Sequence, residues 1–233
     1  MSVATYGSAL IVGAGSGLSA SLARLLANQG IKIALASRST SDLADLEGKT
    51  GAKVFTWDAV KADDVGRLFS EVEAALGAPD LVVYNASFRT RGALVELIPA
   101  DVEKAIAVSA FGAFLVAQQA AKRMLPNRHG AIFFTGASAS VKGYAKSAPF
   151  AMGKFALRGL SQSLARELQP QGIHVAHFVI DGGIRSERRP VPDDKPDSLL
   201  DPDAIAQTYL DVLRQPRNAW TSEVELRPWV ENF

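Results

Sequence analysis

The chain of 233 residues contains no cysteine, and this absence excludes disulfide bridges and zinc sites built from thiolates. It has no apolar run near the ~20 residues of a membrane span, and no internal repeat or low-complexity tract. Basic and acidic residues number 25 and 24, so the charge gives no reason to expect nucleic acid as a partner. The N-terminus also lacks the basic start of a signal peptide. We therefore expect a cytoplasmic protein that binds neither membranes nor nucleic acid, folded as one domain over residues 1–233.

An apolar run, a glycine-rich turn and a helical pattern follow one another near the start of the chain. Residues 9–12 are long enough for one buried strand, the glycines fall within 13–17, and leucines then recur at helical spacing over 18–26. Glycine lets the backbone approach a pyrophosphate closely, and the first N–H groups of a helix have no internal partner. They attract anions together with the helix dipole. The stretch therefore predicts a phosphate-binding corner, with an ordinary strand–helix turn as the alternative.

Short apolar runs alternate with helical patterns along the rest of the chain. This alternation is typical of a parallel sheet with helices on both faces, where ligands bind beyond the carboxyl ends of the strands. The sequence thus predicts an α/β fold with a doubly wound parallel sheet. The expected strands are 9–12, 32–36, 53–56, 81–84, 131–135, 174–179 and 220–227, and the expected helices include 41–50, 62–76, 101–124 and 203–214.

Two motifs resemble those of the short-chain dehydrogenase/reductase family. Gly13-x-x-x-Gly17-x-Ser19 is similar to the family's glycine motif, with serine for its last glycine, and Asn85-Ala86-Ser87 is similar to its Asn-Ala-Gly signature. A partial match to G-x-G-x-x-G is broken by Leu18. The resemblance implies a Rossmann-like sheet of seven strands in the order 3-2-1-4-5-6-7 and a nicotinamide cofactor. The positions it assigns to cofactor binding are Gly13, Ser16, Gly17, Leu18, Ser37, Arg38, Asp58, Asn85, Ala86, Ser87, Lys154, Gly182 and Ile184.

The end of the second expected strand bears on which nicotinamide cofactor is bound. A carboxylate there would accept hydrogen bonds from the adenosine ribose and repel a 2′-phosphate, but the chain has Ser37-Arg38. Because arginine can clamp a phosphate with two hydrogen bonds, NADP(H) is favoured over NAD(H). A solvated surface arginine is the alternative. Asp58, just after the third expected strand, matches the family position that contacts the adenine.

The resemblance is sharpest over residues 130–160, but it fails at the reactive positions. In the family, a tyrosine exchanges the proton with the substrate oxygen, a lysine binds the nicotinamide ribose and lowers the pKa of that tyrosine, and a serine bonds the substrate oxygen. Here Lys154 stands at the lysine position, Phe150 at the tyrosine position and Ala137 at the serine position. Ser138 could take the serine role after a shift of one residue. The predicted catalytic positions are therefore Ser138, Phe150 and Lys154.

Phenylalanine can neither donate nor accept a proton, whereas a positioned general acid contributes about 10²–10⁴ in rate. The usual alcohol–ketone chemistry should be severely weakened unless another group substitutes. Tyr144 is the obvious candidate, with a packing aromatic in a loop as the alternative. Ser109 stands where the family has a supporting asparagine. His174 and His177 lie three apart in one strand and point to opposite faces, so no paired metal site is expected.

The expected helix 101–124 is apolar on more than one face, although a surface helix needs only one apolar stripe. This surplus indicates a contact between subunits, and the resemblance implies a homodimer or homotetramer. Residues from about 184 to 202 are polar and rich in proline. We interpret this segment as the mobile loop that covers a small-molecule substrate in related enzymes.

Three functions are compatible with these patterns. The first is an NADP(H)-dependent oxidoreductase that moves a hydride to or from a small carbonyl or alcohol, with an atypical proton donor. The second is a catalytically impaired NADP(H)-binding sensor or partner protein, which the loss of the tyrosine favours. The third is a non-redox reaction, such as that of a lyase or isomerase, on the same scaffold.

Overall fold

Seven parallel strands form one sheet in the computed structural model, which describes residues 5–230. Their order is β3-β2-β1-β4-β5-β6-β7, so the predicted fold class and strand order are confirmed. The strands are β1 (Ser8–Val12), β2 (Lys32–Ser37), β3 (Lys53–Thr56), β4 (Leu81–Tyr84), β5 (Ala131–Thr135), β6 (His174–Ile180) and β7 (Glu223–Leu226).

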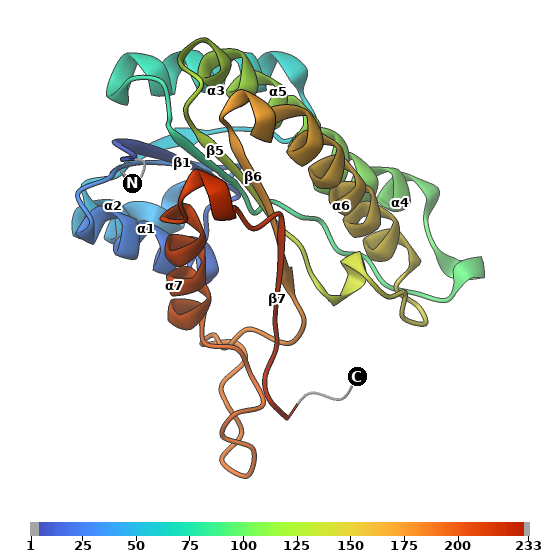
Figure 1. The fold of residues 1–233 in the computed structure, drawn as a ribbon. Coiled ribbons are helices and arrows are strands. Elements are labelled where there is room, and N and C mark those ends of the chain that lie inside the picture. Colours follow the sequence, from blue (N-terminus) through green and yellow to red (C-terminus); the bar gives the residue numbers. More distant parts are fainter. Residues whose placement is uncertain (1–4, 231–233) are drawn as a thin grey trace.

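Helices cover both faces of the sheet (Figure 1). One face carries α1, α2 and α7, and the other carries α3, α5 and α6. No helix within residues 5–230 combines the length and the apolar character needed to cross a membrane. The helices are α1 (Leu18–Asn28), α2 (Ala44–Thr50), α3 (Ala62–Leu76), α4 (Pro99–Ile106), α5 (Gly112–Met124), α6 (Ala148–Leu168) and α7 (Pro202–Leu213).

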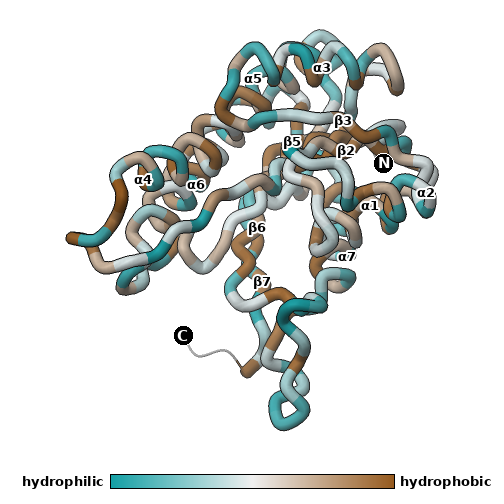
Figure 2. Tube along the Cα trace, turned by 180° about the vertical axis from the view of Figure 1, so that it is seen from behind, coloured by the Kyte–Doolittle hydropathy of each residue, from teal (hydrophilic) through white to brown (hydrophobic). Residues whose placement is uncertain are grey.

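The two faces of the sheet hold separate hydrophobic clusters, because successive side chains of a strand point to opposite sides. In β1, Ile11 joins the cluster that includes Leu22 and Tyr209, whereas Leu10 joins the cluster that includes Leu157. The central strands therefore carry nearly continuous apolar runs, which colour much of them brown in Figure 2, whereas the edge strands β3 and β7 include charged residues. The long segment between β6 and α7 extends away from this core and is mostly hydrophilic.

All strands run the same way, so their carboxyl ends meet at one edge of the sheet. Val12 pairs with Ala36 of β2 on one side and with Tyr84 of β4 on the other. The glycine turn after β1 therefore lies between the ends of β2 and β4. This arrangement brings residues 13–17, 37–38 and 85–87 together, although they are far apart in the sequence.

The expected helix 101–124 was wrong in two respects. It begins earlier, with Pro99 in its first turn, and a π-helical turn at Ala107–Phe111 divides it into α4 and α5. The hydroxyl of Tyr84 donates a hydrogen bond to the carbonyl of Val108 within this turn, so a side chain from the sheet binds a carbonyl of the interrupted helix. Single π-helical turns are frequent at functional sites.

The last strand is shorter than the expected 220–227. Trp220 lies outside the ladder, and its ring stacks on His174 with 4.7 Å between ring centroids. His174 and His177 do point to opposite faces: His174 bonds the carbonyl of Thr221, whereas His177 bonds Glu223. Residues 5–230 contain no group of three or more potential metal ligands.

Candidate functional site

The turn after β1 depends on a close approach between two backbone segments. Gly13 has a φ of +88°, and a Cβ placed on it would lie 2.4 Å from the nitrogen of Ala86. Ser19 fastens the same corner: its hydroxyl donates to the carbonyl of Gly13 at 3.1 Å and accepts from the amide of Asn85 at 2.7 Å. The serine that replaces the third glycine of the motif therefore links the β1 turn to the β4 loop.

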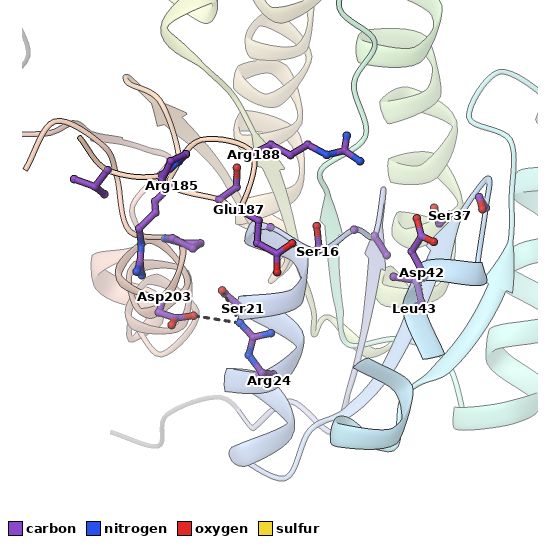
Figure 3. A pocket seen from close by; sticks show the side chains of 18 residues that line it. Ser16, Ser21, Arg24, Ser37, Asp42, Leu43, Arg185, Glu187, Arg188 and Asp203 are labelled. Atoms are coloured by element: carbon purple, nitrogen blue, oxygen red, sulfur yellow. Dashed lines mark hydrogen bonds and ion pairs between the residues drawn. The ribbon is translucent and has the colours of Figure 1, made fainter. Parts of the chain in front are cut away.

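A cavity of about 940 Å³ opens between the start of α1 and the segment after β6. Ser16 and Gly17 line it from one side, and Arg185, Glu187 and Arg188 line it from the other (Figure 3). The free N–H groups at the start of α1 and two of these side chains offer positive charge to an anion. A pyrophosphate-containing dinucleotide fits such a cavity in size and charge, although Glu187 adds one opposing carboxylate.

A smaller cavity of about 220 Å³ continues along the carboxyl ends of β2, β3 and β4. Arg38 is exposed at this cavity, and its side chain has no ion-pair partner among residues 5–230. Asp58 turns its carboxylate to the N–H of Val60 at 3.4 Å, and its neighbours Trp57 and Ala59 line the cavity instead. The other lining residues are Gly13, Ala14, Ser37, Asn85, Ala86, Ser87, Phe88 and Val108.

Three of the predicted cofactor positions present no side chain to the cavities. Leu18 and Ile184 pack against the hydrophobic cluster on the α1 and α7 side of the sheet. Gly182 lies against Pro228, which a Cβ at this glycine would approach within 2.7 Å. These residues can act on a cofactor only through their main chain, because their side-chain positions face the protein. Arg185 and Ser186, two residues that the sequence analysis missed, line the larger cavity; only their place after β6 could have indicated them.

Lys154 of α6 is nearly inaccessible, with 3% of its surface exposed. Its ammonium group donates a hydrogen bond of 2.7 Å to the carbonyl of Thr135, the last residue of β5. Burial lowers the pKa of Lys154 to about 8, because desolvation disfavours the charged form. An amine with this pKa can both bind an anion and exchange a proton near neutral pH.

Phe150 lies one turn before Lys154 on the same helix. The Nζ of Lys154 lies 5.8 Å from the centroid of the Phe150 ring, and the guanidinium carbon of Arg89 lies 4.9 Å from it. Tyr144 is 49% exposed and its hydroxyl interacts with Lys142. The structure therefore gives no contact that would bring Tyr144 to Phe150.

Ser138 takes part in a buried charge network. Its hydroxyl bonds Asp181, a carboxylate only 1% exposed at the end of β6. Lys142 and Arg227 form ion pairs with this carboxylate at 3.0 and 3.2 Å. Burial alone would raise the pKa of Asp181, but the bonds from Ser138 and Lys142 and the charge of Arg227 outweigh it and hold the pKa below its ordinary value. The sequence analysis missed this network because its members come from three separate segments.

Two further polar groups are buried behind Lys154. Ser109, in the π-helical turn, has a hydroxyl without a hydrogen-bond partner in the described part of the chain. His177 bonds Glu223 at 3.0 Å, and Arg158 holds the same carboxylate with two bonds of 2.8 and 2.6 Å. Burial lowers the pKa of His177 from its ordinary value, an effect that hydrogen bonding to Glu223 and its charge offset only in part.

A sequence model described as short chain dehydrogenase matches residues 8–190 of this chain. The chain belongs to the short-chain dehydrogenase/reductase family. This membership makes it an oxidoreductase by family and supports the use of a nicotinamide cofactor.

Individual family members agree with this assignment. A 3-oxoacyl-[acyl-carrier-protein] reductase, MabA, of Mycobacterium tuberculosis is 30% identical over 77% of this chain and 70% of its own length. A short-chain dehydrogenase from Rhodopseudomonas palustris is 31% identical, with a TM-score of 0.82 over 96% of this chain and 99% of its own. A metagenomic short-chain oxidoreductase solved in complex with NADP is 25% identical, with a TM-score of 0.83 over 97% and 98%.

Within the family's framework, the two ends of this site differ. The elements at the glycine turn keep the family's pattern, with serine substituted at Ser19 and Ser87. At the reactive end Lys154 is kept, but Phe150 and Ala137 lack the hydroxyl groups that the family's pattern has there.

Proposed function

We propose that this chain is an NADP(H)-dependent oxidoreductase that reduces a small carbonyl compound or oxidises the corresponding alcohol. The observation that carries the proposal is the glycine corner, where Gly13 is wedged against Ala86 and the start of α1 faces the 940 Å³ cavity. A backbone approach this close tolerates only glycine at position 13. The first N–H groups of α1 have no partner within the helix, so they can bind an anionic ligand. The NADP-bound metagenomic neighbour supports the same cofactor class.

Each part of the cofactor has candidate partners in the chain. We assign the pyrophosphate to the main chain of Ser16, Gly17 and Leu18, and the 2′-phosphate to Arg38. We assign the nicotinamide ribose to Lys154. Asn85 holds the corner together through Ser19. When bound, NADP(H) supplies or accepts the hydride; the chain's residues orient it, exclude water and move the proton.

The proton must come from a group other than Phe150. Lys154 is the candidate that the geometry favours, because its ammonium group lies beside the Phe150 ring and its pKa is about 8. Ser138 is less suited to this role because its hydroxyl is bound to Asp181. We therefore propose that Lys154 both binds the ribose and donates the proton.

A catalytically impaired sensor or partner protein is the second candidate function. The observation that favours it is that positions 150 and 137 carry phenylalanine and alanine, so both hydroxyl groups of the family's pattern are missing. A protein of this kind would bind NADP(H) as tightly as an enzyme, but it would not turn over.

Fluorescence titration with NADPH and NADH, followed by NADPH oxidation with a panel of aldehydes and ketones, separates these candidates. We expect micromolar binding, a preference for NADPH and turnover of some carbonyl compounds. Binding without turnover would favour the sensor, and a preference for NADH would remove Arg38 from the site. If neither cofactor binds, both candidates are rejected.

We also propose a homodimer or homotetramer. Apolar side chains on α6 and at the start of α5 are exposed, among them Phe111 (49%), Phe114 (41%), Met152 (51%) and Phe155 (44%). Sedimentation of the wild type and of Phe155→Glu tests this proposal, because a charge at a subunit contact should yield the monomer. The single domain over 1–233, the substrate-covering role of 184–202 and the cytoplasmic location stay predictions.

A further inference from the structure

Two cations share one apolar ring at the reactive end of the site. Arg89 comes from the loop after β4 and places its guanidinium 4.9 Å from the Phe150 ring centroid, while Lys154 lies 5.8 Å from the same centroid. Two segments far apart in the sequence thus bring positive charge to the position that the family's tyrosine would take. Guanidinium groups stack on aromatic faces and leave their N–H edges free for other partners.

Arg91 and Arg189 add positive charge around Arg89. Burial, and then the charges of these two neighbours, lower the pKa of Arg89 from its ordinary value. Arg189 is held in place by two main-chain hydrogen bonds of 3.0 Å with Ser186. Its guanidinium also packs on Gly183, since a Cβ there would lie 2.6 Å from Nη1. The charges of Arg91, from the loop after β4, and of Arg189, from the segment after β6, therefore both act on Arg89.

These three arginine side chains have no carboxylate partner anywhere in residues 5–230. The buried carboxylate of Asp181 is bound by Lys142 and Arg227. Like charges that gather without counter-charges repel one another, and an anion bound between them would relieve this repulsion.

We infer that the substrate is a small oxo acid whose carboxylate is bound by Arg89, with Arg91 and Arg189 close by. The inference rests on the proposed oxidoreductase function and names its substrate class. The planar guanidinium fork matches a carboxylate with two parallel hydrogen bonds. Because the Arg89 guanidinium lies beside the Phe150 ring, the carboxylate would bind near Phe150 and Lys154 and not at the glycine turn.

This assignment is consistent with the loss of the tyrosine. Reduction of a carbonyl group builds negative charge on its oxygen, and fixed positive charges aimed at that oxygen stabilise the transition state. A carboxylate next to the carbonyl would bring Arg89 and Lys154 within reach of the same oxygen. The chain then depends less on a hydroxyl at position 150.

Isothermal titration with oxamate tests the inference without turnover. Oxamate mimics a 2-oxo acid, and oxamide is its neutral isostere, so the pair differs mainly in the charge of one group. Both are titrated into the free protein and into the NADPH-loaded protein. We expect oxamate to bind at least tenfold more tightly than oxamide in both forms, since the arginine cluster is present without cofactor.

Variants assign the binding to Arg89. Arg89→Met should weaken oxamate binding at least tenfold and leave the affinity for NADPH within twofold, while Arg89→Lys should retain part of the binding. Arg166→Met, an exposed arginine far along α6, is the matched control and should change neither.

Three results would overturn the inference. Equal binding of oxamate and oxamide would show that charge is not recognised, and binding of oxamate that survives Arg89→Met would place the anion elsewhere. Competition by inorganic phosphate at equal concentration would indicate a general anion site and not a carboxylate site. If the wild-type protein does not bind NADPH, the proposed function is rejected. The oxamate titration of the cofactor-free protein still decides whether Arg89 binds a carboxylate.

Discussion

The glycine corner and the Phe150 region, which we propose as the two ends of one site, differ from the family's pattern to different degrees. At the glycine corner two positions differ from the family pattern, and the serine at position 19 forms hydrogen bonds that hold the corner. At Phe150 the reactive hydroxyl is gone and the surroundings are charged. Cofactor binding depends mainly on backbone shape, which many side chains support, whereas proton transfer depends on single side-chain atoms. One end can therefore change its chemistry while the other keeps its geometry.

Restoring both missing hydroxyls should give the largest effect. Phe150→Tyr with Ala137→Ser supplies the donor and the oxyanion partner, and a positioned acid is worth about 10²–10⁴ in rate. We expect kcat/KM for simple ketones to rise by about 10²-fold or more in an NADPH oxidation assay. Ala137→Ser alone is the control and should change kcat/KM only slightly. If the double variant gains nothing, the substrate side has diverged beyond these two positions.

Gly13→Val should remove cofactor binding. A valine at this positive φ is strained by about 1–2 kcal/mol before its side chain meets Ala86. We expect at least a 100-fold weaker affinity for NADPH and an unfolding free energy lower by about 3 kcal/mol, measured by fluorescence titration and chemical denaturation. Gly15→Ala is the matched control for folding, because nothing lies within 4 Å of a Cβ there. Normal NADPH affinity in Gly13→Val would place the dinucleotide outside this corner.

Lys154→Met should change the pH dependence of stability. The folded-state pKa of about 8 lies below the ordinary value of 10.5, so between these pH values the unfolded chain binds more protons than the folded chain. The stability of the wild type should therefore rise from pH 8 to 10.5. At pH 7 the variant should be more stable by about 1–3 kcal/mol, and this advantage should vanish towards pH 10.5. Parallel denaturation curves at all pH values would show that Lys154 is not desolvated.

Arg38→Ala should affect only the choice of cofactor. Loss of a charge-assisted bond to the 2′-phosphate should weaken NADPH about tenfold and leave NADH unchanged, as measured by paired fluorescence titrations. Lys32→Ala, at the opposite end of the same strand, serves as the control and should alter neither affinity. An equal loss for both cofactors would indicate a general electrostatic role for Arg38.

Ser19→Gly should have the smallest effect. The substitution restores the family's glycine but removes the bonds that join Gly13, Ser19 and Asn85. We expect a loss of about 1–2 kcal/mol in unfolding free energy and less than a threefold change in NADPH affinity. Asn85→Ala, which removes only the second bond, should lie between Ser19→Gly and the wild type in stability. An increase in the unfolding free energy of Ser19→Gly would mean that the two hydrogen bonds of Ser19 do not stabilise the corner.

The strands could be predicted from the sequence because buried parallel strands need continuous apolar runs, and such runs are local. Gly13, Arg38, Asn85 and Lys154 could be predicted as candidate site residues because they follow strands or belong to fixed spacings. The π-helical turn could not be found, since it involves a contact with Tyr84, 24 residues away. The Asp181 network and the contact between Arg89 and Phe150 also join distant segments, so no local pattern announces them.

The central position of β1 affects how the chain is made on the ribosome. β1 pairs with β2 soon after synthesis, but its other edge pairs with β4, which begins only at Leu81. At about 5–20 residues per second, several seconds pass before this partner is translated. During that time the edge of β1 that later pairs with β4 keeps its main-chain N–H and C=O groups unpaired, and its side chains are apolar. Shielding of residues 8–12 during this interval would therefore protect the chain from mispairing at this edge.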